Sequence, residues 1–277
     1  MNEELSQHEI IIEPGRKFEQ YWRDLWNYRE LFYFLAWRDI LVRYKQTVIG
    51  VAWSVIRPLL TMIVFTVVFG KLAKMPSEGA PYPILVYAAM LPWQFFASSL
   101  SESSNSLIVN ANMLSKVYFP RLIVPASTVI VSTVDFLISF VILIILMIWY
   151  KFVPDIQILV LPLFFLQALT ASLGFGLWLA ALNVKYRDFR YVVPFIIQFG
   201  LYISPIGFSS SIVPDQWRLL YSINPMVGVI DGFRWAILGN VEFYWQGFLL
   251  SIGLTVLIFV FGLRYFRKTE RSFADVI

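Results

Sequence analysis

The chain of 277 residues contains no cysteine and a single histidine, His8. The absence of cysteine excludes disulfides, thiol nucleophiles and cysteine-ligated metals. One histidine in a polar N-terminal segment cannot build a histidine-ligated zinc site or a Ser-His-Asp triad. We therefore predict no metal ligands and no catalytic residues of these kinds.

Charge is also scarce. Charged residues make up 14% of the chain and hydrophobic residues 58%, whereas about 25% of the residues in a soluble domain are charged. A soluble core of this length cannot enclose so much apolar surface, so lipid must be the solvent for part of it. The net charge of +4 does not indicate nucleic acid, because the basic residues lie where a membrane topology places them.

Sequences that bind nucleotides are missing as well. The chain has no G-x-x-x-x-G-K-S/T and no G-x-G-x-x-G, so it carries no P-loop for ATP. The acidic residues of its apolar stretches occur singly, which disfavours a glycosyltransferase with a carboxylate base or metal-binding acids. A proton-coupled transporter needs buried titratable groups, and only Asp135 qualifies. These absences favour a conduit whose energy comes from another subunit.

Six apolar stretches are long enough to cross a bilayer. We expect spans near 51–70, 83–104, 122–150, 156–183, 191–207 and 244–263. When the gaps are assigned alternately to the two sides, the side of the N-terminus holds 16 of the 22 Lys and Arg residues. Basic flanks resist translocation, so this side is predicted to be cytoplasmic and to hold both termini. The predicted fold class is an all-α integral membrane protein, with residues 47–277 as its six-span domain.

Several segments lie outside the predicted spans. Residues 1–17 are expected to be a polar tail. Within 18–46, aromatic and apolar residues recur every three or four positions, which predicts an amphipathic helix at the cytoplasmic interface, as a membrane anchor or as part of a gate: Trp22, Trp26, Tyr33, Trp37, Ile40 and Tyr44. A short amphipathic helix is expected near 106–118. The external segment 208–240 is broken by proline and glycine, and its short apolar pieces predict re-entrant helices.

Three charged residues fall within the predicted spans. The side chain of Arg57 either reaches back to the interface or faces a pore. Glu102 is either a membrane-embedded acid or lies at the cytoplasmic end of its span. Asp135, near the middle of the third span, must face protein or water, for pairing inside the bundle or for function. We expect the serine hydroxyls around Glu102 to face other helices or water, and Gly174 and Gly176 to permit close helix packing.

A series of short motifs runs along the chain: the residues from Arg38 to Gly50 with Trp53 and Pro58; Lys116, Phe119, Pro120 and Pro125; Asn183 with Tyr186, Arg187 and Asp188; Asn224 with Pro225; and Gly232 to Gly239. In this order the chain resembles the permease subunits of bacterial ABC exporters for cell-surface polysaccharides, namely O-antigen, capsule and teichoic acid. The resemblance covers almost the whole chain. It implies the type-2 exporter fold, with an amphipathic N-terminal helix, a coupling helix after the second span and re-entrant helices between spans five and six.

The resemblance also implies partners. The chain would act in the bacterial cytoplasmic (inner) membrane, among membrane lipids, as a homodimer with two copies of a separate ATPase subunit. That subunit, not this chain, would bind ATP and Mg and drive a lipid-linked polysaccharide outward. The chain itself would be no enzyme and would hold no cofactor. Two other readings stay open: an integral-membrane transferase acting on lipid-linked sugars, and an ABC exporter of a drug or a lipid.

Two sets of candidate residues follow from the resemblance. Aromatic rings can stack on the apolar faces of many sugars, so the expected substrate path is lined by Trp53, Arg57, Trp93, Phe95, Phe96, Phe199, Tyr202 and Phe208. The expected contacts with the ATPase lie in the helix 18–46, in the coupling helix 106–118 and in the loop before span five: Arg43, Tyr44, Lys45, Asn110, Asn112, Met113, Lys116, Arg187 and Asp188.

Overall fold

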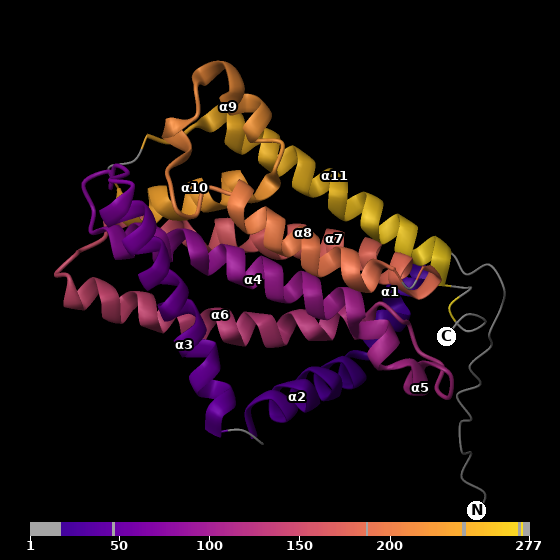
Figure 1. The fold of residues 1–277 in the computed structure, drawn as a ribbon. Coiled ribbons are helices and arrows are strands. Elements are labelled where there is room, and N and C mark those ends of the chain that lie inside the picture. Colours follow the sequence, from indigo (N-terminus) through magenta and orange to yellow (C-terminus); the bar gives the residue numbers. More distant parts are fainter. Residues whose placement is uncertain (1–17, 46–47, 187, 240–241, 271–272, 274–277) are drawn as a thin grey trace, which may run out of the picture.

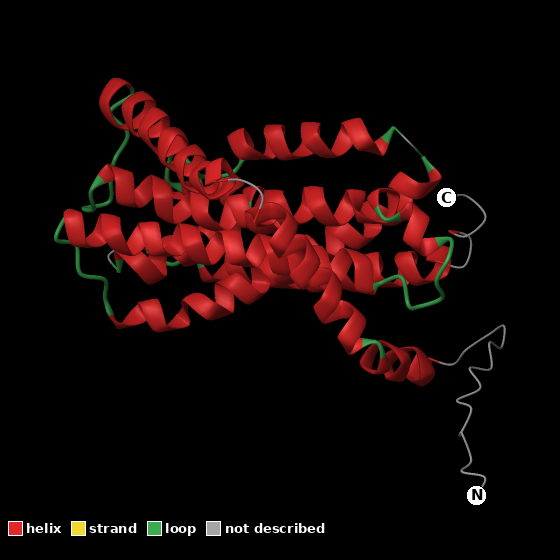
Figure 2. Cartoon of the chain, turned by 90° about the horizontal axis from the view of Figure 1, so that it is seen from below, coloured by secondary structure: helices red, strands yellow, loops and turns green. Residues whose placement is uncertain are grey.

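The computed structural model describes residues 18–45, 48–186, 188–239, 242–270 and 273 (Figure 1). These residues fold into helices, and none of them forms a strand (Figure 2). This confirms the predicted all-α membrane class. The elements are α1 (Phe18–Asn27), α2 (Arg29–Lys45), α3 (Val48–Phe65), the π-helix η1 (Thr66–Leu72), α4 (Tyr82–Val109), α5 (Ala111–Leu114), α6 (Ile123–Trp149), the 3₁₀-helix η2 (Ile156–Val160), α7 (Leu161–Lys185), α8 (Phe189–Ile203), the 3₁₀-helix η3 (Ser210–Ile212), α9 (Asp215–Tyr221), α10 (Pro225–Leu238) and α11 (Trp245–Thr269).

Five helical stretches of the described chain are long and apolar enough to cross a membrane: Val55–Leu72, Tyr82–Val109, Ile123–Trp149, Ile156–Lys185 and Trp245–Thr269. They correspond to five of the predicted spans. The predicted fifth span is α8, which has only 15 residues and rises about 22 Å, less than the ~30 Å of the hydrocarbon core. The sixth crossing and the re-entrant path of 208–240 therefore stay predictions.

The long helices lie side by side and define two ends of the bundle (Figure 1). One end of the bundle, which we call the terminal end, holds α1, α5 and the C-terminus of α11 (Figure 1). The end with the η1–α4 and α6–η2 turns, α9 and α10 is called the pocket end. By the predicted topology the terminal end would be cytoplasmic.

α4 is the central helix of the bundle, in contact with α3, α6, α7, α8 and α10. Most of its side chains are buried, whereas α3, α6 and α11 leave apolar side chains such as Leu60, Leu137 and Leu257 exposed. An outer surface of this kind is stable where lipid replaces water. The main core surrounds α4, and a smaller core closes the terminal end: Leu35, Leu107, Leu114, Phe119, Leu122, Ile123, Val124, Leu177, Ala180, Ala181, Val184, Phe266 and Phe273.

The polar half of α4 is turned inward. The Ser98 hydroxyl lies 3.0 Å from that of Ser132 in α6, and the Ser99 hydroxyl donates to that of Ser172 in α7 at 3.0 Å. The buried Asn183 side chain of α7 donates to the Ser104 carbonyl at 3.1 Å. The prediction that these hydroxyls face neighbouring helices is confirmed.

Glycines bring α7 and α11 into backbone contact. A Cβ atom at Gly174 would lie 2.7 Å from the Cα of Phe259, and one at Gly262 would lie 2.1 Å from the carbonyl oxygen of Gly174. The same atom at Gly253, also in α11, would meet nothing within 4 Å. The packing role predicted for Gly174 is confirmed.

Gly262→Ala is expected to destabilise the protein by about 1–3 kcal/mol, because the new methyl group overpacks the α7–α11 contact. Gly253→Ala is the matched control and should stabilise it by about 0.5–1 kcal/mol, because alanine has less conformational freedom to lose. Thermal unfolding of both variants in the same nanodiscs measures the difference. Equal shifts would mean that the two helices are not in backbone contact.

The irregular stretch after α8 is held by side chains. Arg234 of α10, which is 1% exposed, donates to the carbonyls of Phe208 at 2.7 Å and Ile206 at 2.9 Å. The Tyr82 hydroxyl donates to the Gly207 carbonyl at 2.5 Å, and the Tyr221 hydroxyl donates to the Ile203 carbonyl at 2.7 Å. Carbonyls in and next to a non-helical stretch lack helical partners, and here four of them accept from side chains.

Two predicted helices differ from the structure. The helix expected over 18–46 is broken at Tyr28 into α1 and α2. α1 separates its polar and apolar residues onto two faces, but α2 does not, because α2 packs along α6 with charged side chains in the contact. The helix expected over 106–118 consists of the last turn of α4 and the single turn α5.

Candidate functional site

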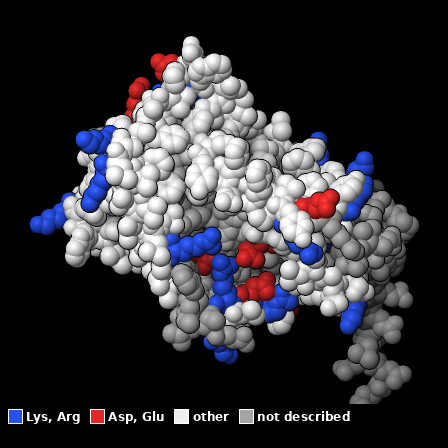
Figure 3. All heavy atoms as spheres, viewed as in Figure 1, with Lys and Arg blue, Asp and Glu red and all other residues white. Residues whose placement is uncertain are grey.

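A cluster of charged residues lies where α2 meets α4 and α6. Arg43 Nη2 lies 2.8 Å from Asp135 Oδ2, and Arg43 Nη1 lies 3.6 Å from Glu102 Oε1. The Tyr44 hydroxyl donates a short hydrogen bond to Asp135 Oδ1. Blue and red side chains gather accordingly in the lower middle of Figure 3, on the side of α2. Asp135, an acid in an apolar helix, thus receives its cation from the N-terminal segment.

A cavity of about 360 Å³ adjoins this cluster, and we call it the α2 pocket. It is lined by Arg38, Asp39, Val42, Arg43, Glu102, Asn105, Ser106, Val109, Asn110, Thr128 and Val131. Arg38 Nη2 lies 2.7 Å from Asp39 Oδ1 and donates to Asn110 Oδ1 at 3.0 Å. The lining holds two guanidinium groups, two carboxylates, and hydroxyl and amide groups, so its formal charge is zero, and both arginines are already paired with acids.

Of the two acids that contact Arg43, Glu102 makes the weaker contact. Its side chain is 51% exposed, against 16% for Asp135, and its contact with Arg43 is the longer of the two. Of the two acids beside Arg43, Glu102 is therefore held less firmly than Asp135. Asp135 is thus paired with Arg43 and Tyr44, and Glu102 lines the α2 pocket.

The predicted ATPase contacts divide into two groups. Arg43 and Tyr44 bond to Asp135 of α6 and are both partly exposed, with 37% of the Arg43 side chain accessible. Lys45, Asn112, Lys116 and Asp188 are exposed, Asn110 and Met113 are partly buried, and Arg187 lies outside the described residues. Leu114 and Phe119 anchor the α5 region in the small core.

Glu270, just after α11, joins three parts of the terminal end. Its Oε1 accepts from the backbone N–H of Arg121 at 2.6 Å, and its Oε2 accepts from the Tyr21 hydroxyl of α1 at 3.0 Å. The Arg121 guanidinium donates a short hydrogen bond to the Glu270 carbonyl. The α5–α6 loop, α1 and α11 are thus tied together. Sequence reasoning missed this residue, because an acid in a basic tail has no distinguishing pattern.

Burial raises the pKa of Glu270 above its ordinary 4.5, against the lowering effect of its hydrogen bonds with Arg121 and Tyr21. The folded state then binds a proton more tightly than the unfolded state, so this contribution to stability is complete below pH 4.5 and is lost as the pH rises through the raised pKa.

As the pH rises from 4.5 through the raised pKa of Glu270, we expect the melting temperature of the native protein to fall relative to that of Glu270→Gln. Glu270→Ala should lower the free energy of unfolding by about 1–3 kcal/mol at every pH, because the Arg121 N–H and the Tyr21 hydroxyl lose their acceptor. A pH-independent difference between the native protein and Glu270→Gln would contradict the assignment.

The aromatic residues predicted for a substrate path are not on one surface. Trp93, Phe95 and Phe96 are only 4%, 2% and 6% exposed, so in this structure they pack in the core and cannot line a path. The reason is that α4 lies at the centre of the bundle, where neighbouring helices cover its aromatic rings. Helix α8, for example, packs directly on Trp93, because a Cβ atom at Gly200 would lie 2.5 Å from that ring.

The other path candidates lie farther out. Phe199 and Tyr202 of α8 are 56% and 64% exposed, and Phe199 stacks on Phe195 at 5.8 Å between ring centroids. Arg57 of α3 is exposed, and Phe208 is partly buried. The Trp53 side chain lies outside the described part of the chain. Among the described path candidates, the exposed ones lie on α8 and α3.

Three charged residues of the pocket end were missed as site candidates: Arg218, Asp231 and Arg234. The signal was present, since charged residues in a predicted re-entrant segment are expensive and mark sites. Arg218 and Arg234 entered the sequence argument only as part of the topology count. Arg234 is fully buried and organises the stretch after α8.

Known proteins are similar to this chain over most of its length. Residues 30–238, or 209 of the 277 residues, match the family described as ABC-2 type transporter. The chain is 27% identical over 242 residues to the O-antigen export system permease protein RfbA of Klebsiella pneumoniae, covering 87% of this chain and 92% of that protein. It is 26% identical to the protein of the same name from Myxococcus xanthus, over 76% of this chain and 82% of that protein. It is 22% identical to the polysialic acid transport protein KpsM of Escherichia coli, over 85% and 92%.

Proposed function

The chain belongs to the ABC-2 type transporter family, and on this premise we propose that it is the transmembrane subunit of an ABC exporter for a lipid-linked cell-surface polysaccharide. The observation that carries the proposal is the similarity over 87% of the chain to a permease named for O-antigen export. The apolar helices support a multi-pass membrane protein. We place it in the bacterial cytoplasmic membrane with the terminal end toward the cytoplasm, as the basic residues indicate.

The energy for transport comes from a partner. The sequence holds no P-loop, so a separate ATPase subunit binds ATP and Mg, and two copies of it serve two copies of this chain. The exposed polar residues Asn112 and Lys116 stand beside an apolar anchor formed by Leu114 and Phe119. This arrangement suits a docking surface that transmits motion of the ATPase subunit to the helix bundle. The reason is that Leu114 and Phe119 belong to the small core.

The α2 pocket is the proposed place for the phosphate of the lipid carrier. Arg43 would donate to the phosphate once the phosphate displaces Glu102, the longer and more exposed of its two acidic partners. Phe199 and Tyr202 of α8 then offer exposed rings to the sugars that follow. A second copy of the chain facing α3 and α8 would enclose this path.

Deletion of the gene in its source bacterium tests the proposal. We expect the surface polysaccharide to disappear and the same polymer, still attached to its lipid, to accumulate inside the cell. A plasmid copy should restore export only when the ATPase partner is intact. Normal surface polysaccharide in the deletion strain would refute the exporter. Loss of the polymer both inside and outside would instead indicate a transferase.

A further inference from the structure

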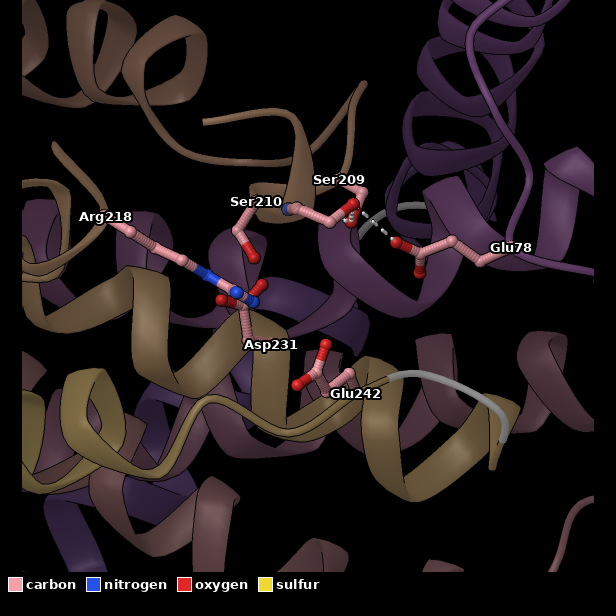
Figure 4. Close-up of a pocket in the computed structure, with 7 residues that line it drawn as sticks. Glu78, Ser209, Ser210, Arg218, Asp231 and Glu242 are labelled. Atoms are coloured by element: carbon pink, nitrogen blue, oxygen red, sulfur yellow. Dashed lines mark hydrogen bonds between the residues drawn. The ribbon is translucent and has the colours of Figure 1, made fainter. Parts of the chain in front are cut away.

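A second polar cavity lies at the pocket end, formed by five separate segments of the chain. It measures about 260 Å³ and is lined by Glu78, Ser209, Ser210, Ser211, Arg218, Asp231 and Glu242. These residues come from the η1–α4 turn, η3 and the residue before it, α9, α10 and the stretch before α11. In Figure 4 the Arg218 guanidinium lies beside the Asp231 carboxylate, with Ser210 and Glu242 facing the same space. We call this cavity the serine pocket.

The serine pocket holds unused hydrogen-bonding capacity. The Ser211 hydroxyl donates to Glu78 Oε1 at 3.1 Å (Figure 4), but Glu78 Oε2 is shielded from solvent and has no partner. Arg218 Nε is likewise shielded and has no hydrogen bond, although its guanidinium lies over the Tyr244 ring at 4.4 Å. Buried groups without partners are costly, so one donor and one acceptor of the pocket wall are left for a ligand.

The wall is also fixed in place before any ligand arrives. Ser209 and Ser210 directly follow the stretch whose carbonyls are held by Arg234, Tyr82 and Tyr221. Asn224 caps α10 by accepting from the Met226 N–H at 3.0 Å and donates to the Ser204 hydroxyl at 3.1 Å. Because these ties cross four elements, the serine hydroxyls and Asp231 keep one geometry. Preorganisation of this kind lowers the entropy lost on binding.

The chemistry of the lining selects the class of ligand. Three carboxylates against one guanidinium give a formal charge of −2, which disfavours an anion. The guanidinium disfavours a metal ion, and no group of three acidic or histidine side chains in the described residues is close enough to hold one. A neutral polyol fits, because each hydroxyl can donate to a carboxylate and accept from Arg218 or a serine.

We propose that the serine pocket binds the hydroxyl groups of a neutral sugar residue, and that the sugar is part of the exported glycan. The second half of this statement rests on the proposed function. The pocket end would lie outside the membrane, so the pocket holds a sugar that has already crossed. Carboxylates and arginine bind hydroxyl groups more strongly than neutral partners do. Binding of a sugar here would slow the return of the polymer into the transporter between successive cycles of ATP hydrolysis.

The test uses the full-length protein in nanodiscs and saturation-transfer NMR. The probes are neutral tetrasaccharides of glucose, mannose and galactose, and a tetramer of sialic acid as the anionic comparison. At least one neutral probe should bind, and more tightly than the sialic acid tetramer. Asp231→Asn should weaken binding about tenfold, as expected for the loss of one charge-assisted hydrogen bond.

Two further variants keep the result interpretable. Glu242→Gln alters an exposed carboxylate at the rim, so it should weaken binding without any risk to folding. Asp215→Asn alters an exposed acid of α9 that does not line the pocket, and it should bind the probes like the native protein. Equal melting temperatures confirm that the variants are folded.

Three outcomes would overturn the proposal: no neutral probe binds; both Asp231→Asn and Glu242→Gln bind as the native protein does; or Ca²⁺ binds at the pocket and displaces the sugar, which makes it a cation site. The exporter itself is tested separately by the gene deletion above. Normal export in cells together with failed sugar binding would remove this inference and leave the proposed function standing.

Discussion

Replacing Asp135 by alanine is expected to abolish polysaccharide export and to destabilise the protein by about 2–4 kcal/mol. The substitution leaves the Arg43 guanidinium in the α2–α6 contact without its 2.8 Å partner and removes the acceptor of the Tyr44 hydroxyl. The Arg43 guanidinium is only partly desolvated and keeps Glu102 at 3.6 Å, so the loss stays below that of a fully buried pair. Surface polysaccharide and the melting temperature in nanodiscs measure the two effects.

The matched control is Glu102→Gln, which removes the longer and more exposed partner of the same arginine. It should leave the free energy of unfolding within about 1 kcal/mol of the native value, as for exposed pairs. The exchange of both charges, Arg43→Asp with Asp135→Arg, should recover part of the stability lost in Asp135→Ala. If Asp135→Ala and Glu102→Gln behaved alike, the ion pair would not be the element that holds α2 on α6.

Arg234→Met is expected to have the second large effect. The methionine fills much of the same space, but the carbonyls of Ile206 and Phe208, which lie outside helices, lose their donor. The Leu85 carbonyl, 3.4 Å from Arg234 Nε, stays within helix α4. At about 1–3 kcal/mol for each of the two carbonyls left unpaired, a loss of about 2–6 kcal/mol follows. Thermal unfolding measures it, and limited proteolysis should show new cleavage within 204–213.

Arg57→Met controls for the loss of one arginine, because Arg57 is exposed on α3. It should leave both the melting temperature and the cleavage pattern of 204–213 as they are in the native protein. Unchanged proteolysis in Arg234→Met would show that the stretch after α8 is held by something other than this guanidinium. Sugar binding to the serine pocket should fall in Arg234→Met as well, since the same stretch orients Ser209 and Ser210.

Composition and periodicity were sufficient to predict the long helices. The ends of the predicted second, third and fourth spans lie within a few residues of α4, α6 and η2–α7, because a lipid-facing helix must be apolar over its whole crossing. Helices outside the spans were predicted less well. The break at Tyr28 and the shortness of α5 depend on packing against α6 and the small core, and packing leaves little trace in a local pattern.

Site residues divided in the same way. The sequence marked Asp135 as an acid that must face protein or water, but it gave no partner, because Arg43 is 92 positions away and in another helix. It also grouped Trp93, Phe95 and Phe96 with Phe199 and Tyr202 as a sugar path. Aromatic side chains look alike in sequence whether they fill a core or line a surface, and only the neighbours of α4 and α8 separate the two sets.

The amino-acid sequence alone determined that this is a helical membrane protein without a P-loop motif, because hydrophobic length and a short motif are local properties. The tertiary structure alone decided which charges meet: Arg43 with Asp135, Glu270 with Tyr21 and Arg121, and the residues of the serine pocket. Each of these joins segments far apart in the chain. Electrostatic and hydrogen-bonding partners act over a few ångströms in space, and distance along the sequence does not report that separation.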